Sequence, residues 1–251
     1  MSNLRGLTVA VTGGNSGLGL GMSIGLAKAG ANIAVWGRNT ERNKAAAEQI
    51  ASHGVQAIAV DCDVADEDQI EAAMARTVAE LGPLGAVFAN SGIAGHTNLV
   101  DTSLDEWHRI MAVNVDGAFL TARAAARRFI EQDSGGSLVL VSSTASVFGA
   151  TGVGAYSPSK CAVVGLGRTL AVELARYRVR CNILVPGWTR TAMNENMQRN
   201  ERFMDATIAR TPVRRWATPD EFEKVAVFLA DPEQTYHTGN EVVVDGGYCV
   251  F

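Results

Sequence analysis

The chain has 251 residues, of which 47% are hydrophobic and 19% are charged, and its formal net charge is −4. This composition is typical of a globular protein with a substantial buried core, and it excludes an intrinsically disordered chain. The negative balance and the lack of a basic block argue against nucleic acid or an anionic membrane surface as the main partner.

Short β-branched runs alternate with longer alanine-rich stretches along the chain. Strands are predicted at Leu7–Val11, Asn32–Trp36, Val55–Val60, Ala86–Asn90, Gly136–Ser142, Arg180–Val185 and Glu241–Val244. Helices are predicted at 17–29, 40–52, 66–81, 103–131, 156–176 and 219–230. The strands are almost continuously apolar, which is typical of strands covered on both faces. The pattern therefore predicts an α/β fold: a single doubly wound, Rossmann-type parallel sheet of seven strands flanked by helices on both faces.

No internal repeat, low-complexity segment or linker divides the sequence, so we expect residues 1–251 to form one domain. The long polar segment 187–217 interrupts the alternation and carries Met193, Met197, Phe203 and Met204 among many charges. Long irregular segments of compact domains are commonly functional. We expect a substrate lid at about 188–216, and an amphipathic surface helix is an equally good interpretation.

A glycine-rich turn follows the first strand and opens the first helix. Glycines permit a tight turn and a close approach of the backbone to a pyrophosphate, and the positive end of the helix faces the phosphates. The position of the turn after the first strand makes it more specific than a glycine-rich turn alone. The candidate cofactor-binding residues here are Gly13, Asn15, Ser16, Gly17, Leu18 and Gly19.

The end of the second strand bears on the choice between NAD and NADP. An acidic residue there favours NAD, and an arginine favours the additional phosphate of NADP. The sequence has Arg38 and Asn39 and no carboxylate at this place. The guanidinium of Arg38 suits a phosphate, although a solvated surface arginine explains it too. We expect NADP, with NAD as the alternative.

Tyr156 and Lys160 lie four residues apart at the start of a predicted helix, which places both side chains on one face. A phenol has a reference pKa of about 10 and is a poor base at neutral pH. A positive charge at about 4 Å contributes on the order of 4 kcal/mol at an effective dielectric of about 20, or roughly three pKa units before desolvation. Helped by the positive charge of an oxidised nicotinamide, Lys160 is therefore expected to make Tyr156 a working acid and base.

The chain resembles the short-chain dehydrogenase/reductase family almost from end to end, from the glycine-rich turn at 12–19 to Val244-Asp245-Gly246-Gly247. The resemblance implies a catalytic tetrad. Ser143, thirteen residues before the tyrosine, is favoured over Ser142, and Asn114 lies in an Asn-Val-x-Gly pattern. The tetrad is Asn114, Ser143, Tyr156 and Lys160. Ser143 is expected to orient the reacting oxygen, Lys160 to hold the nicotinamide ribose, and Asn114 to hold a water beside Lys160.

The resemblance also implies further contacts with the cofactor. Asp63 and Val64 match the family's adenine-contacting pair, and the Pro186-Gly187 segment matches its nicotinamide-carboxamide site. The fourth strand departs from the family pattern, because Ala89 and Ser91 replace the usual asparagine and alanine, so its end is expected to be braced differently. The additional candidates are Asn90, Ser91, Gly92, Tyr156, Lys160, Trp188, Thr189 and Thr191.

The substrate is expected to be a small carbonyl or alcohol compound. Candidate substrate-contacting residues are Ser143, Ala145, Phe148, Tyr156, His96, Trp188 and Met193. The arginines of the lid segment indicate an anionic substrate, or else are solvated and ion-paired; they are Arg199, Arg202, Arg210, Arg214 and Arg215. The turn Asp245-Gly246-Gly247 is interpreted as structural.

These patterns together predict one dinucleotide-binding and catalytic domain, an NAD(P)-dependent alcohol dehydrogenase or carbonyl reductase. The alternatives are an NAD-dependent sugar, polyol, steroid or cyclic alcohol dehydrogenase, and a dinucleotide-sensing protein without turnover. Four scattered cysteines and the lack of an apolar leader in Met1–Arg5 indicate a cytoplasmic protein without disulfides, a metal site or a membrane segment. The resemblance implies a homotetramer, with a dimer as the alternative.

Overall fold

The computed structural model describes residues 3–251, so the first two residues of the predicted domain lie outside the described part. Its strands form one sheet in the order β3-β2-β1-β4-β5-β6-β7, and all neighbouring strands are parallel. The predicted seven-stranded parallel sheet is confirmed, with strand ends displaced by no more than two residues. The strands are β1 Thr8–Thr12, β2 Asn32–Gly37, β3 Ala57–Asp61, β4 Leu84–Ala89, β5 Gly136–Val141, β6 Val179–Pro186 and β7 Glu241–Val244.

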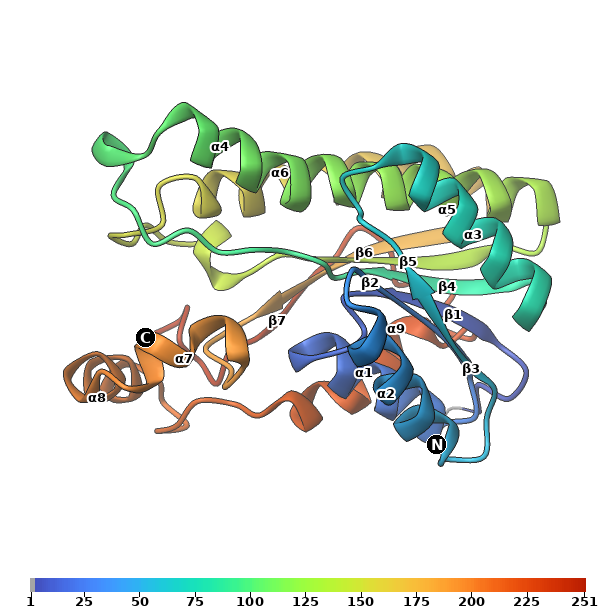
Figure 1. The fold of residues 1–251 in the computed structure, drawn as a ribbon, viewed down its shortest axis with the longest axis horizontal. Coiled ribbons are helices and arrows are strands. Elements are labelled where there is room, and N and C mark those ends of the chain that lie inside the picture. Colours follow the sequence, from blue (N-terminus) through green and yellow to red (C-terminus); the bar gives the residue numbers. More distant parts are fainter. Residues whose placement is uncertain (1–2) are drawn as a thin grey trace.

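Helices cover both faces of the sheet (Figure 1). One face carries α3 (Glu67–Leu81), α4 (Leu104–Met111), α5 (Gly117–Gln132) and α6 (Tyr156–Leu174). The opposite face carries α1 (Gly17–Lys28), α2 (Thr40–Ala51) and α9 (Glu223–Ala230). Burial on both faces explains why the central strands are apolar at successive positions, since each side chain of a strand points into one of two cores.

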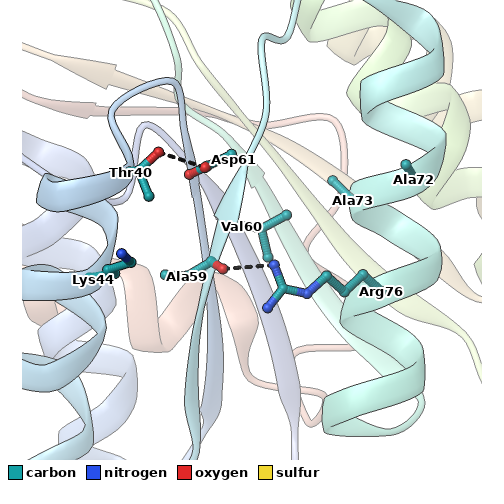
Figure 2. A pocket seen from close by; sticks show the side chains of 8 residues that line it. All are labelled: Thr40, Lys44, Ala59, Val60, Asp61, Ala72, Ala73 and Arg76. Carbon is teal, nitrogen blue, oxygen red and sulfur yellow. Dashed lines mark hydrogen bonds between the residues drawn. The ribbon is translucent and has the colours of Figure 1, made fainter.

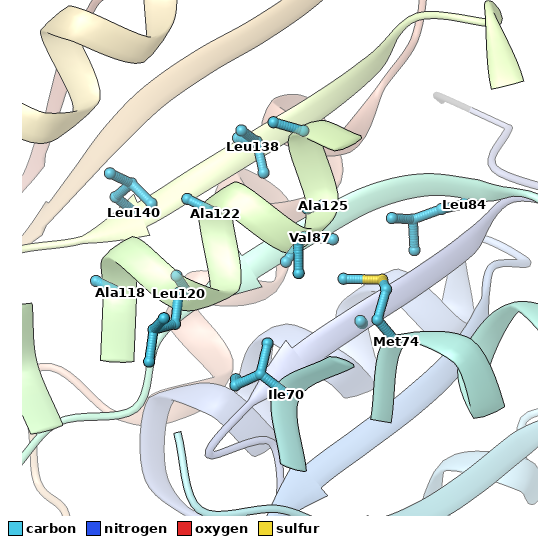
Figure 3. Packing of buried hydrophobic residues seen from close by; sticks show 14 of the residues in the cluster. Ile70, Met74, Leu84, Val87, Ala118, Leu120, Ala122, Ala125, Leu138 and Leu140 are labelled. Atoms are coloured by element: carbon cyan, nitrogen blue, oxygen red, sulfur yellow. The ribbon is translucent and has the colours of Figure 1, made fainter. Parts of the chain in front are cut away.

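The larger core lies between the sheet and helices α3, α5 and α6. Figure 3 shows its centre, a single cluster that includes Ile70 and Met74 of α3, the small residues Ala118 and Ala122 of α5, and Leu138 of β5. Alanines along α5 bring this helix close to the strands, because their side chains fill little space. This packing holds β4 and β5 in place, and the segments after both strands enter the site described below.

A π-helical turn interrupts the predicted continuous helix 103–131. The turn spans Ala112–Asp116 and separates α4 from α5. A π turn lets one residue leave the regular helical positions, and such turns occur frequently at functional sites. Here it places Asn114 in the interior, where the side chain makes three hydrogen bonds. Regular helical periodicity in the sequence does not reveal this turn.

The segment predicted as an irregular insertion, 187–217, contains two short helices, α7 (Glu195–Gln198) and α8 (Glu201–Arg210). They lie beyond one end of the sheet, near the C-terminus (Figure 1). Met204 and Thr207 of α8 are buried, whereas Glu201 and Arg202 are exposed, so α8 is amphipathic. Short 3-10 turns lie at Leu99–Asp101, Thr144–Ser146, Ala175–Tyr177, Ala192–Asn194 and Pro219–Phe222. Within residues 3–251, no helix is both long and apolar enough to cross a membrane.

The core packing predicts that replacing two different leucines by alanine has very different effects on the free energy of unfolding. Leu138 is fully buried, whereas Leu99 is 66% exposed. We expect Leu138→Ala to lower the free energy of unfolding by about 2–5 kcal/mol, through lost burial and the cavity left behind. The matched control Leu99→Ala should change it by less than about 0.5 kcal/mol. Urea unfolding measures both values, and equal losses would contradict the packing described.

Candidate active site

A cavity of about 570 Å³ runs along the carboxyl ends of the strands. Ligands of parallel α/β sheets bind at this edge. The cavity is lined by residues that follow six strands in succession, from Gly13 after β1 to Trp188 after β6, and by Tyr248 beyond β7. Every residue predicted for the site lines this cavity except Asn114. The structure therefore brings together residues that lie far apart in the sequence.

The glycine-rich turn forms a close-fitting cradle at the start of α1. Gly13 and Gly17 have φ angles of 63° and 51°, in the left-handed region that favours glycine. A methyl group on Gly19 would lie only 2.2 Å from the carbonyl oxygen of Gly13. Thr12 and Asn90 tie this turn to the end of β4, because Asn90 Nδ2 donates to Thr12 O at 2.9 Å and the Asn90 N–H donates to Thr12 Oγ1 at 2.9 Å. Although Ala89 and Ser91 depart from the family pattern, hydrogen bonds between Asn90 and Thr12 join the end of β4 directly to the end of β1.

The N-terminus of α1 differs from the starts of α2, α3, α4 and α8. Ser16 precedes α1 and makes no capping hydrogen bond through its side chain. By contrast, Asn39, Asp66, Ser103 and Asn200 each accept a hydrogen bond from the first turn of their helices. Uncapped N–H groups at a helix start, next to glycines that leave space, fit a pyrophosphate. The residues present therefore fit the dinucleotide that the sequence predicts.

A buried asparagine that the sequence reasoning missed supports the cradle from beneath. Asn43 of α2 accepts a hydrogen bond from Asn15 Nδ2 at 2.6 Å and donates to Gly37 O at 2.7 Å and to Asp61 Oδ1 at 2.9 Å. Hydrogen bonds from Thr40 and then Asn43 hold the pKa of Asp61 below its usual value. The sequence signal that could have identified Asn43 is its position as a polar residue inside the alanine-rich stretch 40–52.

The end of β2 presents Arg38 to the cavity. Its guanidinium is 66% exposed and lies 3.9 Å from Asp63, so a weak ion pair leaves it accessible. Asn39 also lines the cavity, but its side-chain oxygen accepts a hydrogen bond from the Arg42 N–H and so caps α2. Arg42, in the first turn of α2, lines the cavity as well. Two guanidinium groups are therefore available at this end.

The two adjacent serines after β5 have different surroundings. Ser142 is buried, and its hydroxyl donates to the carbonyl oxygen of Lys160 at 2.9 Å. Ser143 lines the cavity together with Tyr156 and acts to lower the pKa of the phenol. The hydroxyl of Ser143 also accepts from the Ala145 N–H at 3.1 Å. Ser143 is thus the serine placed to contact a reacting oxygen beside Tyr156.

Without a bound cofactor, Tyr156 is not more acidic than usual, and the expectation that Lys160 and an oxidised nicotinamide together activate it stays a prediction. Burial raises the pKa of Tyr156 above its usual value, although the hydrogen bond with Ser143 lowers it in part. Burial also lowers the pKa of Lys160 to about 8. The Lys160 ammonium lies 5.7 Å from the centre of the Tyr156 ring and donates to Val141 O at 2.9 Å. Desolvation disfavours the charged form of both groups.

Asn114 lies behind the cavity wall. Its Oδ1 accepts from the Ile93 N–H at 2.8 Å, and its Nδ2 donates to Ile93 O at 3.0 Å and to Ser159 Oγ at 2.9 Å. A methyl group on Gly92 would lie 3.3 Å from both Asn114 Oδ1 and Lys160 Nζ, so all three residues meet at one point. Asn114 therefore positions the segment after β4 against Lys160.

The opposite end of the cavity is aromatic. Trp188 stacks on Trp216 with ring centres 5.0 Å apart and meets the edge of Phe203 at 5.2 Å. Tyr248 packs against Phe148 at 5.2 Å. Phe203 and Tyr248 line the cavity and were not predicted as site residues; the turn at 245–247, interpreted only as structural, positions Tyr248. Among the other substrate candidates, Ala145 is half-buried, and His96 and Met193 are exposed at the rim.

The segment after β6 closes the remaining side. A methyl group on Gly187 would lie 2.6 Å from the Asp245 backbone, so a side chain does not fit there. Thr189 and Thr191 are held by Asn194, whose Nδ2 donates to Thr189 O at 2.8 Å and whose Oδ1 accepts from the Thr191 N–H at 3.1 Å. Val64 is buried beside Gly117, and Asp63 lines the cavity.

A second cavity of about 350 Å³ lies between α2 and α3 (Figure 2). There Thr40 Oγ1 donates to Asp61 and Arg76 donates to Ala59 O, so the polar groups are largely used within the protein. No predicted site residue lines it. In the described part of the chain, no three histidine, cysteine or acidic side chains are grouped as metal ligands would be.

Comparison with known proteins gives a consistent result. A family model described as enoyl-(acyl carrier protein) reductase matches residues 13–249. The chain is 36% identical to the 2,5-dichloro-2,5-cyclohexadiene-1,4-diol dehydrogenase of Sphingobium indicum, covering 99% of both chains. A short-chain type dehydrogenase/reductase from Mycobacterium marinum matches with 33% identity and a TM-score of 0.93, over 98% of this chain and 96% of that one.

A third match is the gluconate 5-dehydrogenase of Burkholderia cenocepacia in complex with NADP and tartrate. It is 32% identical with a TM-score of 0.95, over 99% of this chain and 97% of that one. Sequence, fold and the arrangement of the cavity agree with these matches over nearly the whole chain. The chain belongs to the short-chain dehydrogenase/reductase family and is an NAD(P)-dependent oxidoreductase.

Proposed function

We propose that this chain interconverts a carbonyl compound and a secondary alcohol with NADP as its preferred cofactor, and that Asn114, Ser143, Tyr156 and Lys160 carry the reaction. The observation that supports this most directly is that Ser143 and Tyr156 line the same cavity, with the Lys160 ammonium 5.7 Å from the centre of the phenol ring. A protein that only binds dinucleotides has no need for these groups to converge.

Tyr156 acts as the proton donor in reduction and as the acceptor in oxidation. Burial raises its pKa, so the phenol keeps its proton at neutral pH and is ready to protonate a carbonyl oxygen. Ser143 donates a hydrogen bond to the same oxygen and orients it. A bound nicotinamide supplies the hydride to the carbonyl carbon or accepts it from the alcohol carbon.

Lys160 supports the phenol and would hold the nicotinamide ribose. Its ammonium has one fixed acceptor, Val141 O, which leaves further donors for ribose hydroxyls. The charge of Lys160 alone does not lower the pKa of Tyr156 below its usual value, so in oxidation the positive charge of the oxidised cofactor is needed as well. Asn114 positions Gly92 and Ile93 against Lys160 and would hold a water for proton exchange.

The preference for NADP rests on the end of β2. Arg38 and Arg42 line the cavity there, and among the described lining residues the one carboxylate is that of Asp63, already beside Arg38. A guanidinium group binds a phosphate through two parallel hydrogen bonds. The related gluconate 5-dehydrogenase contains NADP, which supports the same choice here.

The remaining features of the prediction are also proposals. Residues 1–251 form one dinucleotide-binding and catalytic domain in the cytoplasm, and the segment 188–216 serves as a lid whose inner face carries Trp188, Met193, Met197, Phe203 and Thr207 at the cavity. Exposed apolar residues on α5 and α6, among them Phe119 and Val172, support association through these helices into a homotetramer, with a dimer as the alternative.

Replacing Tyr156 tests the acid and base role. We expect Tyr156→Phe to lower kcat by about 10²–10⁴-fold, because the proton donor is lost while the ring remains. NADPH binding, measured by cofactor fluorescence, should be nearly unchanged. The control Tyr236→Phe removes a fully exposed hydroxyl and should keep full activity. Near-normal turnover in Tyr156→Phe would refute the role.

Replacing Arg38 tests the cofactor choice. Arg38→Asp removes a charge-assisted contact worth about 1.5–3 kcal/mol, so kcat/KM for NADPH should fall by roughly 10- to 150-fold relative to NADH. The control Arg5→Asp makes the same charge change at an exposed position outside the cavity. An unchanged ratio of the two cofactors in Arg38→Asp contradicts the assignment.

The buried Lys160 predicts a pH-dependent stability. Its pKa in the folded protein is about 8, below the ordinary 10.5, so the unfolded chain binds the extra proton and stability rises with pH through this window. Between about pH 7 and 9 the wild type should gain about 1 kcal/mol relative to Lys160→Met. Urea unfolding at each pH measures the difference, and the exposed control Lys44→Met should show none. Parallel curves for wild type and Lys160→Met would contradict the shifted pKa.

A further inference from the structure

The two ends of the cavity differ in charge. The charged residues that line it are Arg38, Arg42, Asp63 and Lys160. Arg38 and Asp63 follow β2 and β3 at one edge of the sheet, Arg42 lies in the first turn of α2 next to them, and Lys160 donates to Val141 O. Among residues 3–251, no arginine, lysine, aspartate or glutamate lines the other end, beyond β5. The substrate end is therefore uncharged, with His96 exposed at its rim.

Two polar side chains in the wall of this end, those of Thr207 and Trp188, are already used or covered. Thr207 Oγ1 donates to Phe203 O at 2.9 Å and accepts from Trp216 Nε1 at 2.9 Å. Trp188 Nε1 is buried, with no hydrogen-bond partner among the described residues. The wall therefore presents mainly ring faces and hydrocarbon to a substrate, together with the reacting hydroxyls of Ser143 and Tyr156.

The rings of Phe148 and Tyr248 are held in place from outside the cavity. The Arg210 guanidinium lies 4.7 Å from the centre of the Phe148 ring and 4.3 Å from that of Tyr248, and Arg210 itself does not line the cavity. Asp245 accepts hydrogen bonds from the Gly247 and Cys249 N–H groups and so fixes the turn that carries Tyr248. These contacts hold in place two aromatic rings that line the same cavity as Ser143 and Tyr156.

The other lid arginines do not supply a cation either. None of the five lines the cavity. Arg199 pairs with Glu195, Arg215 pairs with Glu221, and Arg214 donates to the carbonyl oxygen of Ala209. A carboxylate placed among these rings would lose hydration without gaining a cation, which is costly. The hydroxyl groups of a polyhydroxylated acid would likewise lose their hydrogen bonds to water and face aromatic rings instead.

We propose that the substrate is a neutral ring compound, a cyclic ketone or cyclic secondary alcohol, whose ring packs against Phe148 and Tyr248. This inference rests on the proposed function and names the substrate class of the same site. The names of the matched proteins include both a cyclic diol and a sugar acid, gluconate, so they do not decide between the two classes.

Three substrates, two of them a matched pair, test the proposed substrate class. Purified enzyme and NADPH are mixed with cyclohexanone, with a cyclohexanone that carries a carboxylate opposite the carbonyl, and with 5-keto-D-gluconate. We expect kcat/KM for cyclohexanone to exceed that of either acid by about a hundredfold, since each acid must bury an unpaired charge. Equal or better turnover of the acids overturns the inference.

Variants of Tyr248 and Phe148 test whether these two side chains bind the ring of the substrate. Tyr248→Ala and Phe148→Ala should each lower kcat/KM for cyclohexanone by about tenfold, and change that for acetone much less, because a ring-to-ring contact is lost. Tyr248→Phe keeps the ring and should stay near the wild type. Phe148 lies on a loop and is only half-buried, so its variant remains informative if Tyr248→Ala does not fold. Uniform losses for both ketones contradict ring recognition.

Two further outcomes separate the proposals. In the first outcome, the wild type prefers the acids and Arg210→Met selectively abolishes their turnover. The cavity then uses the Arg210 cation and the neutral-substrate inference is wrong, while the oxidoreductase function stands. If NADPH binds but no ketone or acid of the panel is reduced, and no matching alcohol is oxidised with NADP, the proposed function fails together with the inference.

Discussion

The buried ammonium of Lys160 is the interaction on which the catalytic site depends. A cation with so little exposure is stable only if its surroundings are arranged around it. Val141 O at the end of β5 accepts from Nζ, Ser142 donates to the Lys160 carbonyl oxygen, and Gly92 leaves room for the head group. These contacts join α6, β5 and the segment after β4, and place Ser143 beside Tyr156.

The cost of that burial is visible in the lowered pKa of Lys160 and the raised pKa of Tyr156. The protein alone therefore keeps the phenol protonated, which suits a proton donor in reduction. Oxidation of an alcohol requires additional positive charge next to the phenol, and an oxidised nicotinamide brings it. The site is thus arranged so that cofactor binding and proton transfer depend on the same few groups.

The strand order gives the cavity its two chemically different ends. Because β3 and β2 lie at one edge of the sheet and β6 and β7 at the other, the segments after them reach opposite ends of one cavity. The first pair contributes Asp63 and Arg38, and the second contributes Trp188 and Tyr248. In the proposed function, topology therefore separates the cofactor end from the substrate end, and the proposed catalytic residues Ser143, Tyr156 and Lys160 come after β5, between them.

The sequence by itself determined the alternation of strands and helices, the parallel sheet and the glycine-rich turn, because periodicity and motif spacing are local properties of the chain. It also offered the candidate catalytic residues, of which Asn114 and Ser143 came from the resemblance to a known family. The tertiary structure alone decided the π turn that buries Asn114, the Asn15–Asn43 contact, the direction of the Tyr156 pKa shift and the approach of Arg210 to Phe148 and Tyr248. Each of these depends on desolvation or on contacts between distant segments. Spacing along the chain carries no information about burial, so neither the balance of charge and desolvation nor the aromatic substrate end was predictable from it.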